Sequence, residues 1–281
     1  MKTSGAWIFL GLLWLFPAQP LPAQQGKWGN LFDGKDLKGW DTYIGPPLDD
    51  SGKMLSQQPV GLNHDPHRVF TVVDQQGEKL VRVSGENWGC LFTRNEYADF
   101  HLRLMFKWGK LLWSSKKKKK RDSGLLYFSV GENGADYGAW MRSQEFQIEE
   151  GNCGEYWGVA GGAEDIPATQ SPNGDWVYNP SGSWHTFSEK SPVGRHCVKR
   201  GDAEKPSGEW NNLDLYCHGD TSVHVINGTV MMVLYHSSQL QNGSLVPLTK
   251  GKLQIQSEGA EIFYKNIVIE PLIAIPAGWL N

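Results

Sequence analysis

The chain lacks the patterns that mark helical folds, membrane spans and nucleotide sites. No amphipathic segment of ten or more residues escapes interruption by glycine or proline, which argues against a helical architecture. After the N-terminal segment, no run provides the roughly 20 apolar residues that a membrane helix needs. No Gly-x-Ser-x-Gly elbow and no phosphate-binding glycine loop before a helix is present. The sequence therefore gives no support to a serine hydrolase of the elbow type or to a nucleotide-binding fold.

The chain also has a small net charge, no zinc-binding motif and few cysteines. The formal net charge is −3, which argues against nucleic acid as a partner. The eight histidines form no His-x-His or Glu-x-x-His pair, so there is no zinc signature. Four cysteines in an exported chain allow up to two disulfides. Cys90 and Cys217 lie in strand-like runs and fit buried thiols, whereas Cys153 and Cys197 lie in loop-like sequence and are the first pair to test as a disulfide.

The N-terminus predicts export. A lysine at position 2 precedes an apolar run over residues 6–16, prolines follow at 17 and 20, and Ala23 supplies a small residue at a cleavage site. We interpret residues 1–23 as a signal peptide, the alternative being a buried N-terminal helix. The remaining residues, 24–281, have the length of a single all-β domain. The predicted location is secreted or periplasmic, with no membrane span.

Strand-like alternation is the main pattern in this mature region. In residues 100–108 the even positions are all large and apolar, while most odd positions are polar. Asn227-Gly228 separates two further runs and is a strong hairpin signal, because both central residues must take positive φ. These runs predict antiparallel sheets packed face to face. The other predicted strands cover residues 125–130, 145–149, 213–218, 223–226, 229–235, 253–255 and 262–269.

Two compositional features point weakly towards carbohydrate. The chain has 13 tryptophans, whose flat apolar rings suit stacking on sugars, although large sandwich cores also use tryptophan. Residues 115–121 read Ser-Lys-Lys-Lys-Lys-Lys-Arg between two predicted strands. We interpret this segment as an exposed, solvated hairpin loop, the alternative being contact with an acidic surface or a polyanionic glycan.

The strand at residues 145–149 carries the most informative polar pattern. Alternation places Glu145, Gln147 and Glu149 on one face and sends Phe146 and Ile148 to the core. Two carboxylates and an amide in one row can hold hydroxyls, bind a cation or move protons. An ordinary solvent-facing strand surface is the alternative interpretation.

The surroundings of this strand favour a site. Trp140 and Arg142 precede it, and a glycine-rich loop over residues 150–157 follows it with further acids and aromatic residues, ending at Trp157. Stacking rings, carboxylates that bind hydroxyls and a cation are the combination that a sugar site needs.

Six longer segments carry further information: residues 31–40 (LFDGKDLKGW), 121–125 (RDSGL), 145–148 (EFQI), 208–211 (GEWN), 225–228 (VING) and 264–267 (YKNI). In these segments the chain resembles the 3-keto-disaccharide hydrolase family. The resemblance covers nearly all of the mature chain, and its order along the chain is more specific than any single segment. It implies a concanavalin/laminin-G-like jelly-roll β-sandwich of two antiparallel sheets. The chain departs from similar sequences at Phe128, where they carry histidine, and at Asn152 and Glu155, where they carry aspartate.

The resemblance implies cleavage of 3-keto glycosides by net hydrolysis or by 1,2-elimination. A ketone at C3 acidifies the hydrogen at C2, so a base can remove it and the C1 substituent can leave. By position, Glu145 or Glu149 is the base or a ligand of a possible divalent metal ion, and Gln147 binds a hydroxyl. Arg142 or that metal ion offsets the enolate charge. The candidate substrate-binding residues are Trp140, Tyr127, Trp157, Glu150 and Asn211.

Two other functions remain open at this point. A non-catalytic carbohydrate-binding module of the same fold is favoured by the departures at Phe128 and Asn152, whereas the row of acids favours an enzyme. A structural or adhesion domain would bind no soluble sugar. The expected partner is an oligosaccharide or a 3-keto glycoside.

Overall fold

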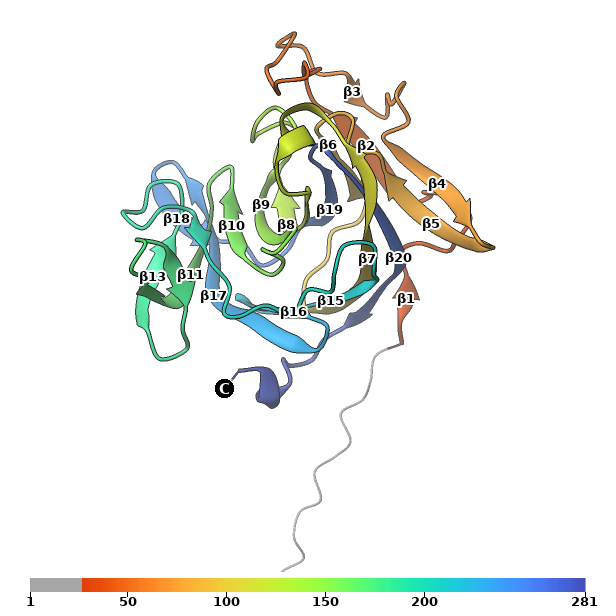
Figure 1. Cartoon of the computed structure of the whole chain (residues 1–281). Helices are drawn as coiled ribbons and strands as arrows, with labels where there is room; N and C mark the ends of the chain where they lie inside the picture. Colours follow the sequence, from red (N-terminus) through yellow and green to blue (C-terminus); the bar gives the residue numbers. More distant parts are fainter. Residues whose placement is uncertain (1–26, 281) are drawn as a thin grey trace, which may run out of the picture.

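The alternating segments fold into two antiparallel β-sheets in the computed structural model, which describes residues 27–280. The larger sheet runs in the order β12-β11-β17-β16-β15-β7-β20-β5-β4, and β1, β13 and β18 pair at its borders. The smaller sheet runs in the order β14-β10-β9-β8-β19-β6-β2-β3. Strands β17, β16, β15, β7 and β20 curve around β10, β9, β8 and β19 (Figure 1). The prediction of an all-β sandwich is confirmed.

Twelve strands form the larger sheet and eight the smaller. The larger contains β1 Gly29–Asn30, β4 Phe70–Gln75, β5 Glu78–Val83, β7 Phe100–Leu112, β11 Gly162–Gln170, β12 Trp176–Tyr178, β13 Ser183–Phe187, β15 Asn211–His218, β16 Thr221–Ile226, β17 Thr229–Gln241, β18 Ser244–Pro247 and β20 Ala260–Pro271. The smaller contains β2 Trp40–Ile44, β3 Gly61–Leu62, β6 Gly89–Thr93, β8 Asp122–Val130, β9 Arg142–Glu149, β10 Tyr156–Val159, β14 His196–Cys197 and β19 Lys252–Ser257.

Helix is confined to two short 3-10 turns within residues 27–280, η1 (Ser114–Lys118) and η2 (Ala277–Trp279). No helix in this part of the chain is long and apolar enough to cross a membrane. The predicted signal peptide, residues 1–23, lies outside the described residues. The segment predicted as a plain hairpin loop at 115–121 contains most of η1. That interpretation is wrong for Lys116, whose side chain is only 12% exposed.

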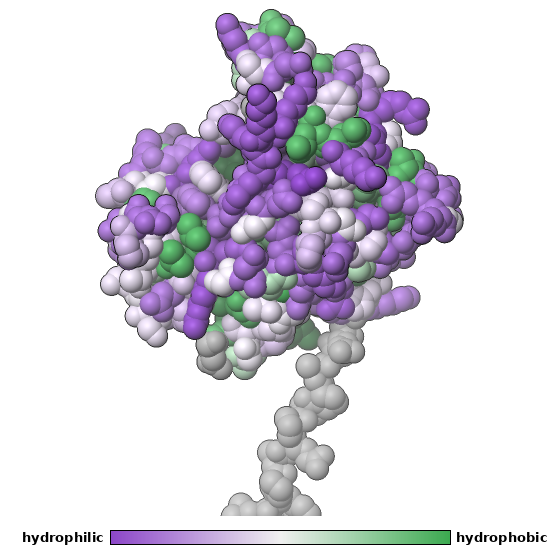
Figure 2. Space-filling view, in the orientation of Figure 1, coloured by the Kyte–Doolittle hydropathy of each residue, from purple (hydrophilic) through white to green (hydrophobic). Residues whose placement is uncertain are grey.

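The main core lies between the two sheets. The even positions of β7, such as Leu104 and Phe106, are buried there, and Arg103 on the alternate face is exposed. Phe146 and Ile148 of β9 join the same core, as alternation predicts. Burying one such side chain contributes about 1.5–3 kcal/mol. The face of the molecule in Figure 2 is correspondingly hydrophilic, with small separate apolar patches.

The Asn-Gly signal is confirmed at the β16–β17 hairpin. Asn227 and Gly228 both have positive φ, 49° and 80°, in the turn that joins the two strands. The side chain of Asn227 also accepts the backbone N–H of Asn212 at 2.9 Å. The turn therefore fixes the register of the strands that lead away from it.

All four cysteines are free and buried. The prediction that Cys90 and Cys217 are buried thiols is confirmed, but the proposed Cys153–Cys197 disulfide is wrong. Cys153 packs in the core between the sheets and donates to the Glu149 carbonyl at 3.4 Å, while Cys197 packs in a second apolar cluster at β14. Burial raises the pKa of both thiols.

Candidate functional site

A pocket of about 350 Å³ opens on the face of the smaller sheet that points away from the main core. The row Glu145, Gln147 and Glu149 of β9 lines it, as alternation predicts. In neighbouring strands, Asp122 of β8 pairs with Glu149, and Trp157 of β10 pairs with Glu145. Side chains of β8 and β10, the strands on either side of β9, therefore add to its polar row and widen it into a pocket.

Glu145 lies at the floor of this pocket and is only 6% exposed. The carboxyl fits because Gly124 of β8 has no side chain: a Cβ there would lie 2.5 Å from Glu145 Oε1 and still closer to Gln256 Oε1. Burial, and then the charge of Asp122, raise the pKa of Glu145 well above its usual range. A carboxyl in this environment favours its protonated form and can donate a proton.

A carboxylate–imidazole pair lies on the same side of the sheet. His196 of β14 pairs in register with Trp157, and its Nε2 lies 2.7 Å from Oε2 of the buried Glu155. The imidazole ring also stacks on the Trp157 ring, with centroids 4.1 Å apart. With Nε2 held by Glu155, Nδ1 is the ring nitrogen left to exchange a proton with a ligand.

Arg195 supplies a fixed positive charge in the pocket. Its guanidinium donates to Asp136 Oδ2 at 2.8 Å and lies over the rings of Tyr137 and Trp157, 5.8 and 5.6 Å from their centroids. Burial is the largest single influence and opposes this charge, but the hydrogen bond to Asp136 together with the negative charges of Asp136, Tyr137 and Glu189 outweighs it and raises the pKa of Arg195. Held in this way, Arg195 can stabilise negative charge that develops on a ligand.

Aromatic rings form the opposite part of the pocket lining. Trp88 and Trp140 stack with centroids 5.5 Å apart, and the exposed Tyr137 packs edge-on against both. Trp140 Nε1 donates to the Gly89 carbonyl at 3.0 Å, which fixes its ring. Trp88 Nε1 and Trp157 Nε1 are buried but have no hydrogen-bond partner among the residues described. Two donors are therefore available to a polar ligand between aromatic faces.

A group of acids surrounds Lys116 at one end of the pocket. Lys116 Nζ donates to Asp122 Oδ2 and lies 3.6 Å from Glu258 Oε1. Burial, and then the charge of Asp122, raise the pKa of Glu258. Burial also raises the pKa of Asp122, although Lys116 opposes that shift. Lys116 is thus the counter-ion of this acid group.

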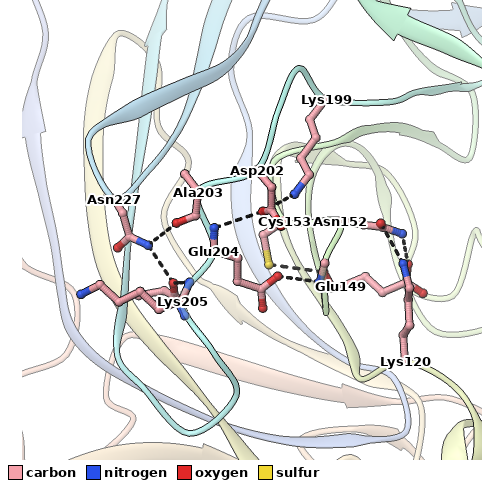
Figure 3. A network of polar contacts seen from close by, with 12 residues as sticks. Lys120, Glu149, Asn152, Cys153, Lys199, Asp202, Ala203, Glu204, Lys205 and Asn227 are labelled. Atoms are coloured by element: carbon pink, nitrogen blue, oxygen red, sulfur yellow. Dashed lines mark hydrogen bonds and ion pairs between the residues drawn. The ribbon is translucent and has the colours of Figure 1, made fainter. Parts of the chain in front are cut away.

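The turn after β9 is held by a polar network that runs from Asn152 in the pocket lining to Lys120 and Glu204, which do not line the pocket (Figure 3). Asn152 donates through Nδ2 to Glu149 Oε2 and accepts from Lys120 Nζ at 2.9 Å. Glu204 accepts the Gly151 N–H at 2.6 Å and the Trp108 Nε1–H at 3.0 Å. The network fixes the orientation of the Glu149 carboxylate at the pocket edge.

Residues 27–270 match the model of a family described as the 3-keto-alpha-glucoside-1,2-lyase-like domain. The chain belongs to this family. A search of curated proteins finds no significant match.

Solved structures of similar shape have low sequence identity to this lyase-like domain. Two are predicted glycosyl hydrolases from Parabacteroides distasonis. One is 19% identical with a TM-score of 0.48, and the match covers 88% of this chain and 100% of that structure's chain. The other is 18% identical with a TM-score of 0.47, and the match covers 88% of this chain and 94% of that structure's chain. A carbohydrate-binding module from Bacillus subtilis is 10% identical with a TM-score of 0.40 and covers 72% and 91%. The family assignment rests on the sequence match.

The structure of this lyase-like domain brings together five of the predicted site residues in one pocket: Glu145, Gln147, Glu149, Trp140 and Trp157. Gln147 uses its side-chain oxygen to accept the Ile148 N–H at 3.1 Å, which leaves its amide N–H groups for a ligand.

Two of the predicted site residues, Tyr127 and Arg142, do not face the pocket. Tyr127 is fully buried in the main core, where its hydroxyl lies 2.8 Å from Ser222 Oγ, so its ring cannot form a sugar platform. Arg142 stands three positions before Glu145, an odd offset along the strand, and therefore lies on the other face of β9. It donates to the Ala160 carbonyl at 2.7 Å and to Gln239 at 3.1 Å. Arg195 takes the position in the pocket that the sequence assigned to Arg142.

Two further predicted residues support the site from outside it. Glu150 forms an ion pair with Arg121, 2.9 Å between Oε2 and the guanidinium. Asn211 begins β15 in the other sheet and accepts the Lys205 N–H at 2.8 Å, which anchors the segment that carries Glu204. Neither residue lines the pocket. Phe128 also lies outside it: its ring packs in the main core against Phe100.

Several pocket residues were missed by the sequence analysis. Arg195 and His196 lie in a turn-rich segment without strand periodicity, and only their adjacency to each other offered a signal. Asp122 lay within a segment matched to the family but received no role. The remaining missed residues are Trp88, Lys116, Asp136, Tyr137, Asn152, Glu155, Val159, Gln256 and Glu258.

The predicted metal site at Glu145 and Glu149 does not fit this arrangement. Within residues 27–280, no three His, Cys, Asp or Glu side chains converge in a way that could hold a metal ion. Glu149 is engaged by Asn152, and the nearby acids already have Lys116 as their cation.

Proposed function

We propose that this protein cleaves 3-keto glycosides by removing the C2 proton and expelling the C1 substituent, with net hydrolysis when water then adds. One observation carries the proposal: a single aromatic-walled pocket joins a buried, proton-holding carboxyl, Glu145, to an imidazole held by a carboxylate, His196 with Glu155. Membership of the 3-keto-alpha-glucoside-1,2-lyase-like family supports the choice of substrate.

His196 is the base in this mechanism. Its Nε2–H is donated to Glu155, so the Nδ1 lone pair is free to accept the C2 proton. The imidazolium that forms is stabilised by the buried Glu155 carboxylate, in the way that a carboxylate orients and stabilises a catalytic histidine elsewhere. Stacking on Trp157 fixes the plane of the ring.

Glu145 is the acid. A raised pKa keeps its proton in place near neutral pH, and the carboxyl is at the floor of the pocket where the departing oxygen can reach it. General acid catalysis of this type contributes roughly 10²- to 10⁴-fold. Arg195 stabilises the enolate oxygen at C3, because its guanidinium is the pocket cation that lies beside the rings of Tyr137 and Trp157.

The steps balance without an added cofactor. His196 takes the C2 proton, and the C–H electron pair forms an enolate with the C3 carbonyl. The enolate expels the C1 oxygen, which receives the Glu145 proton, giving the free aglycone and a 3-keto sugar with a C1–C2 double bond. Water then adds its hydroxyl to C1 and gives a proton to Glu145, and the His196 proton returns to C2.

The aromatic lining suits a pyranose. Apolar C–H faces of a sugar stack on rings such as Trp140 and Trp157, and the unpartnered N–H groups of Trp88 and Trp157 can bind its hydroxyls. The N-terminal sequence adds the proposal that the enzyme is exported, so that it meets its glycoside outside the cytoplasm.

Aglycone release from a 3-keto glucoside tests the proposal. We expect release by the purified protein, with transient near-ultraviolet absorbance of the conjugated enone, and no release from the same glucoside lacking the ketone. Glu145→Gln and His196→Asn should each slow release at least a hundredfold. Activity that a chelator abolishes, and that a divalent ion restores, would replace Arg195 with a metal as the enolate stabiliser.

A second outcome would contradict the enzymatic proposal. Sugar binding in calorimetry without any release from α- or β-linked 3-keto glucosides would assign the pocket to a carbohydrate-binding module.

A further inference from the structure

A second hollow, of about 680 Å³, lies on the face of the larger sheet that points away from the main core. Phe106 of β7 and Tyr264 of β20 point into that core, so alternation turns their neighbours Lys107 and Phe263 to the opposite face. Lys107 and Phe263 pair in register and both line the hollow, which we call the outer-face hollow. Its volume falls within the range of ligand pockets, roughly 300–1,000 Å³, and no described residue lines both it and the pocket of the proposed reaction.

The floor of the outer-face hollow is fixed by hydrogen bonds. Glu261 Oε1 accepts from Arg82 Nε at 2.7 Å, and Glu261 Oε2 accepts the backbone N–H of Lys110 at 3.0 Å. Gly109 leaves the space for this carboxylate, because a Cβ at that position would collide with it. The carboxylate is therefore engaged by the protein itself and holds the backbone of β7 in place beside Lys110.

Two lysines of the outer-face hollow have no acidic partner. Lys107 is half-buried, and its Nζ lies 3.4 Å from the Gln75 amide oxygen and over the rings of Trp210 and Phe263, 4.8 and 5.9 Å from their centroids. Neither Lys107 nor the exposed Lys110 forms an ion pair with any described residue. Rings and an amide hold the Lys107 ammonium in place, but the protein supplies no counter-ion for it.

The acids beside these lysines are already neutralised by other cations. The ion pairs are Glu261–Arg82 at 2.7 Å, Glu150–Arg121 at 2.9 Å and Glu78–Lys265 at 2.8 Å. The two free lysines therefore give the outer-face hollow a surplus of positive charge, which attracts an anionic group.

An indole ring lies beside this charge. Trp210 belongs to the segment 208–211, and Lys265, whose ammonium lies 4.3 Å from the centroid of the same ring, belongs to 264–267. Both segments carry the family resemblance, and the proposed reaction uses neither residue. Indole surface suits the apolar C–H face of a pyranose. The outer face thus combines a sugar-binding ring with unpaired cations.

We propose that the outer-face hollow binds an acidic sugar chain built of uronates, with Lys107 and Lys110 on its carboxylates and Trp210 in contact with its pyranose rings. A uronate joins a carboxylate to a pyranose, and ammonium groups bind carboxylates through charge-assisted hydrogen bonds. The chain as a whole carries a formal net charge of −3, so a polyanion is drawn to a local basic site and not to the protein in general. Binding here stands apart from the proposed reaction, because the two sites share no described residue.

Calorimetry with a galacturonic acid oligomer at low salt tests the proposal. We expect the wild type to bind the oligomer and not its full methyl ester, which keeps the rings and removes the charges. Lys107→Met should weaken binding about tenfold, the contribution of one hydrogen bond to a charged group, and Lys110→Glu should abolish it. Lys250→Met, which removes a lysine 61% exposed outside the hollow, should bind like the wild type.

The catalytic pocket provides the second control. His196→Asn should bind the oligomer as tightly as the wild type, and Lys107→Met should release aglycone from a 3-keto glucoside at the wild-type rate. Loss of oligomer binding in His196→Asn would assign the acidic sugar to the catalytic pocket and overturn the proposal.

Three other results would also overturn it. They are a wild type that binds no oligomer, a methyl ester that binds as tightly as the acid, and Lys110→Glu that binds like the wild type. Lys110 is exposed, so its substitution leaves the fold intact and the test stands even if Lys107→Met does not fold.

Discussion

Replacing Glu145 with glutamine separates its catalytic role from its structural one. Glutamine keeps the shape of the carboxyl and cannot donate a proton from oxygen. The space that Gly124 leaves for Glu145 is unchanged, so the substitution should not disturb packing. A loss of activity without a loss of stability is therefore the expected signature.

The expected loss in kcat/KM is roughly 10²- to 10⁴-fold, the usual contribution of a general acid. At 1.36 kcal/mol for each tenfold change, this corresponds to about 3–5 kcal/mol of transition-state stabilisation. The loss should be smaller for a nitrophenyl 3-keto glucoside than for an alkyl one, because a stable phenolate leaves without protonation.

At pH 7 the Glu145→Gln substitution should raise the stability of the fold, although it lowers the activity. Glutamate in an unfolded chain has a pKa of about 4.3, and burial raises the folded value above it. Folding thus favours the protonated carboxyl. Its contribution to stability is complete below about pH 4 and is lost as the pH rises towards the folded pKa. Glu145→Gln should match the wild type near pH 4 and have the higher melting temperature at pH 7.

Parallel kinetics and thermal unfolding of Glu145→Gln, with Glu132→Gln as an exposed control, would check both signs. Retention of activity within threefold on an alkyl 3-keto glucoside would refute the acid role. A melting temperature below that of the wild type at pH 7 would refute the reasoning on burial.

Two further predictions follow from the pocket and the core. Trp157→Phe keeps the stack on His196 but removes the unpartnered N–H. The affinity for a 3-keto sugar, measured by calorimetry, should therefore fall by roughly 2- to 13-fold, or about 0.5–1.5 kcal/mol. The control Trp184→Phe, at a ring 58% exposed outside the pocket, should leave the affinity unchanged. An unchanged affinity in Trp157→Phe would remove the indole from the site. A thiol reductant should leave the melting temperature unaltered, because all four cysteines are free, and a drop of several degrees would reveal a disulfide.

Local patterns determined much of the fold and the centre of the site. Alternation along β7 and β9 separates core from solvent, because side chains of a strand point to opposite faces. This rule alone placed Phe146 in the core and the row Glu145, Gln147 and Glu149 together. Asn227-Gly228 fixed a hairpin by its backbone requirement.

The same rule was insufficient where both faces of a strand are apolar. Tyr127 and Leu126 of β8 alternate, yet both are buried: Tyr127 lies in the main core, and Leu126 lies in a separate apolar cluster that also contains Trp140. Hydrophobicity therefore carried no information on direction in β8, and Tyr127 was assigned to the wrong face.

Residue patterns along the chain were enough to predict the strand class of most segments, the β-sandwich and the acidic row on β9. They could not show that Arg195, His196 and Glu155 complete that row, or that Lys116 turns inward to meet Asp122 and Glu258. The two kinds of information differ in their range along the chain. Alternation and turn propensity act over a few residues, whereas these partners meet through the register of strands and turns distant in the sequence.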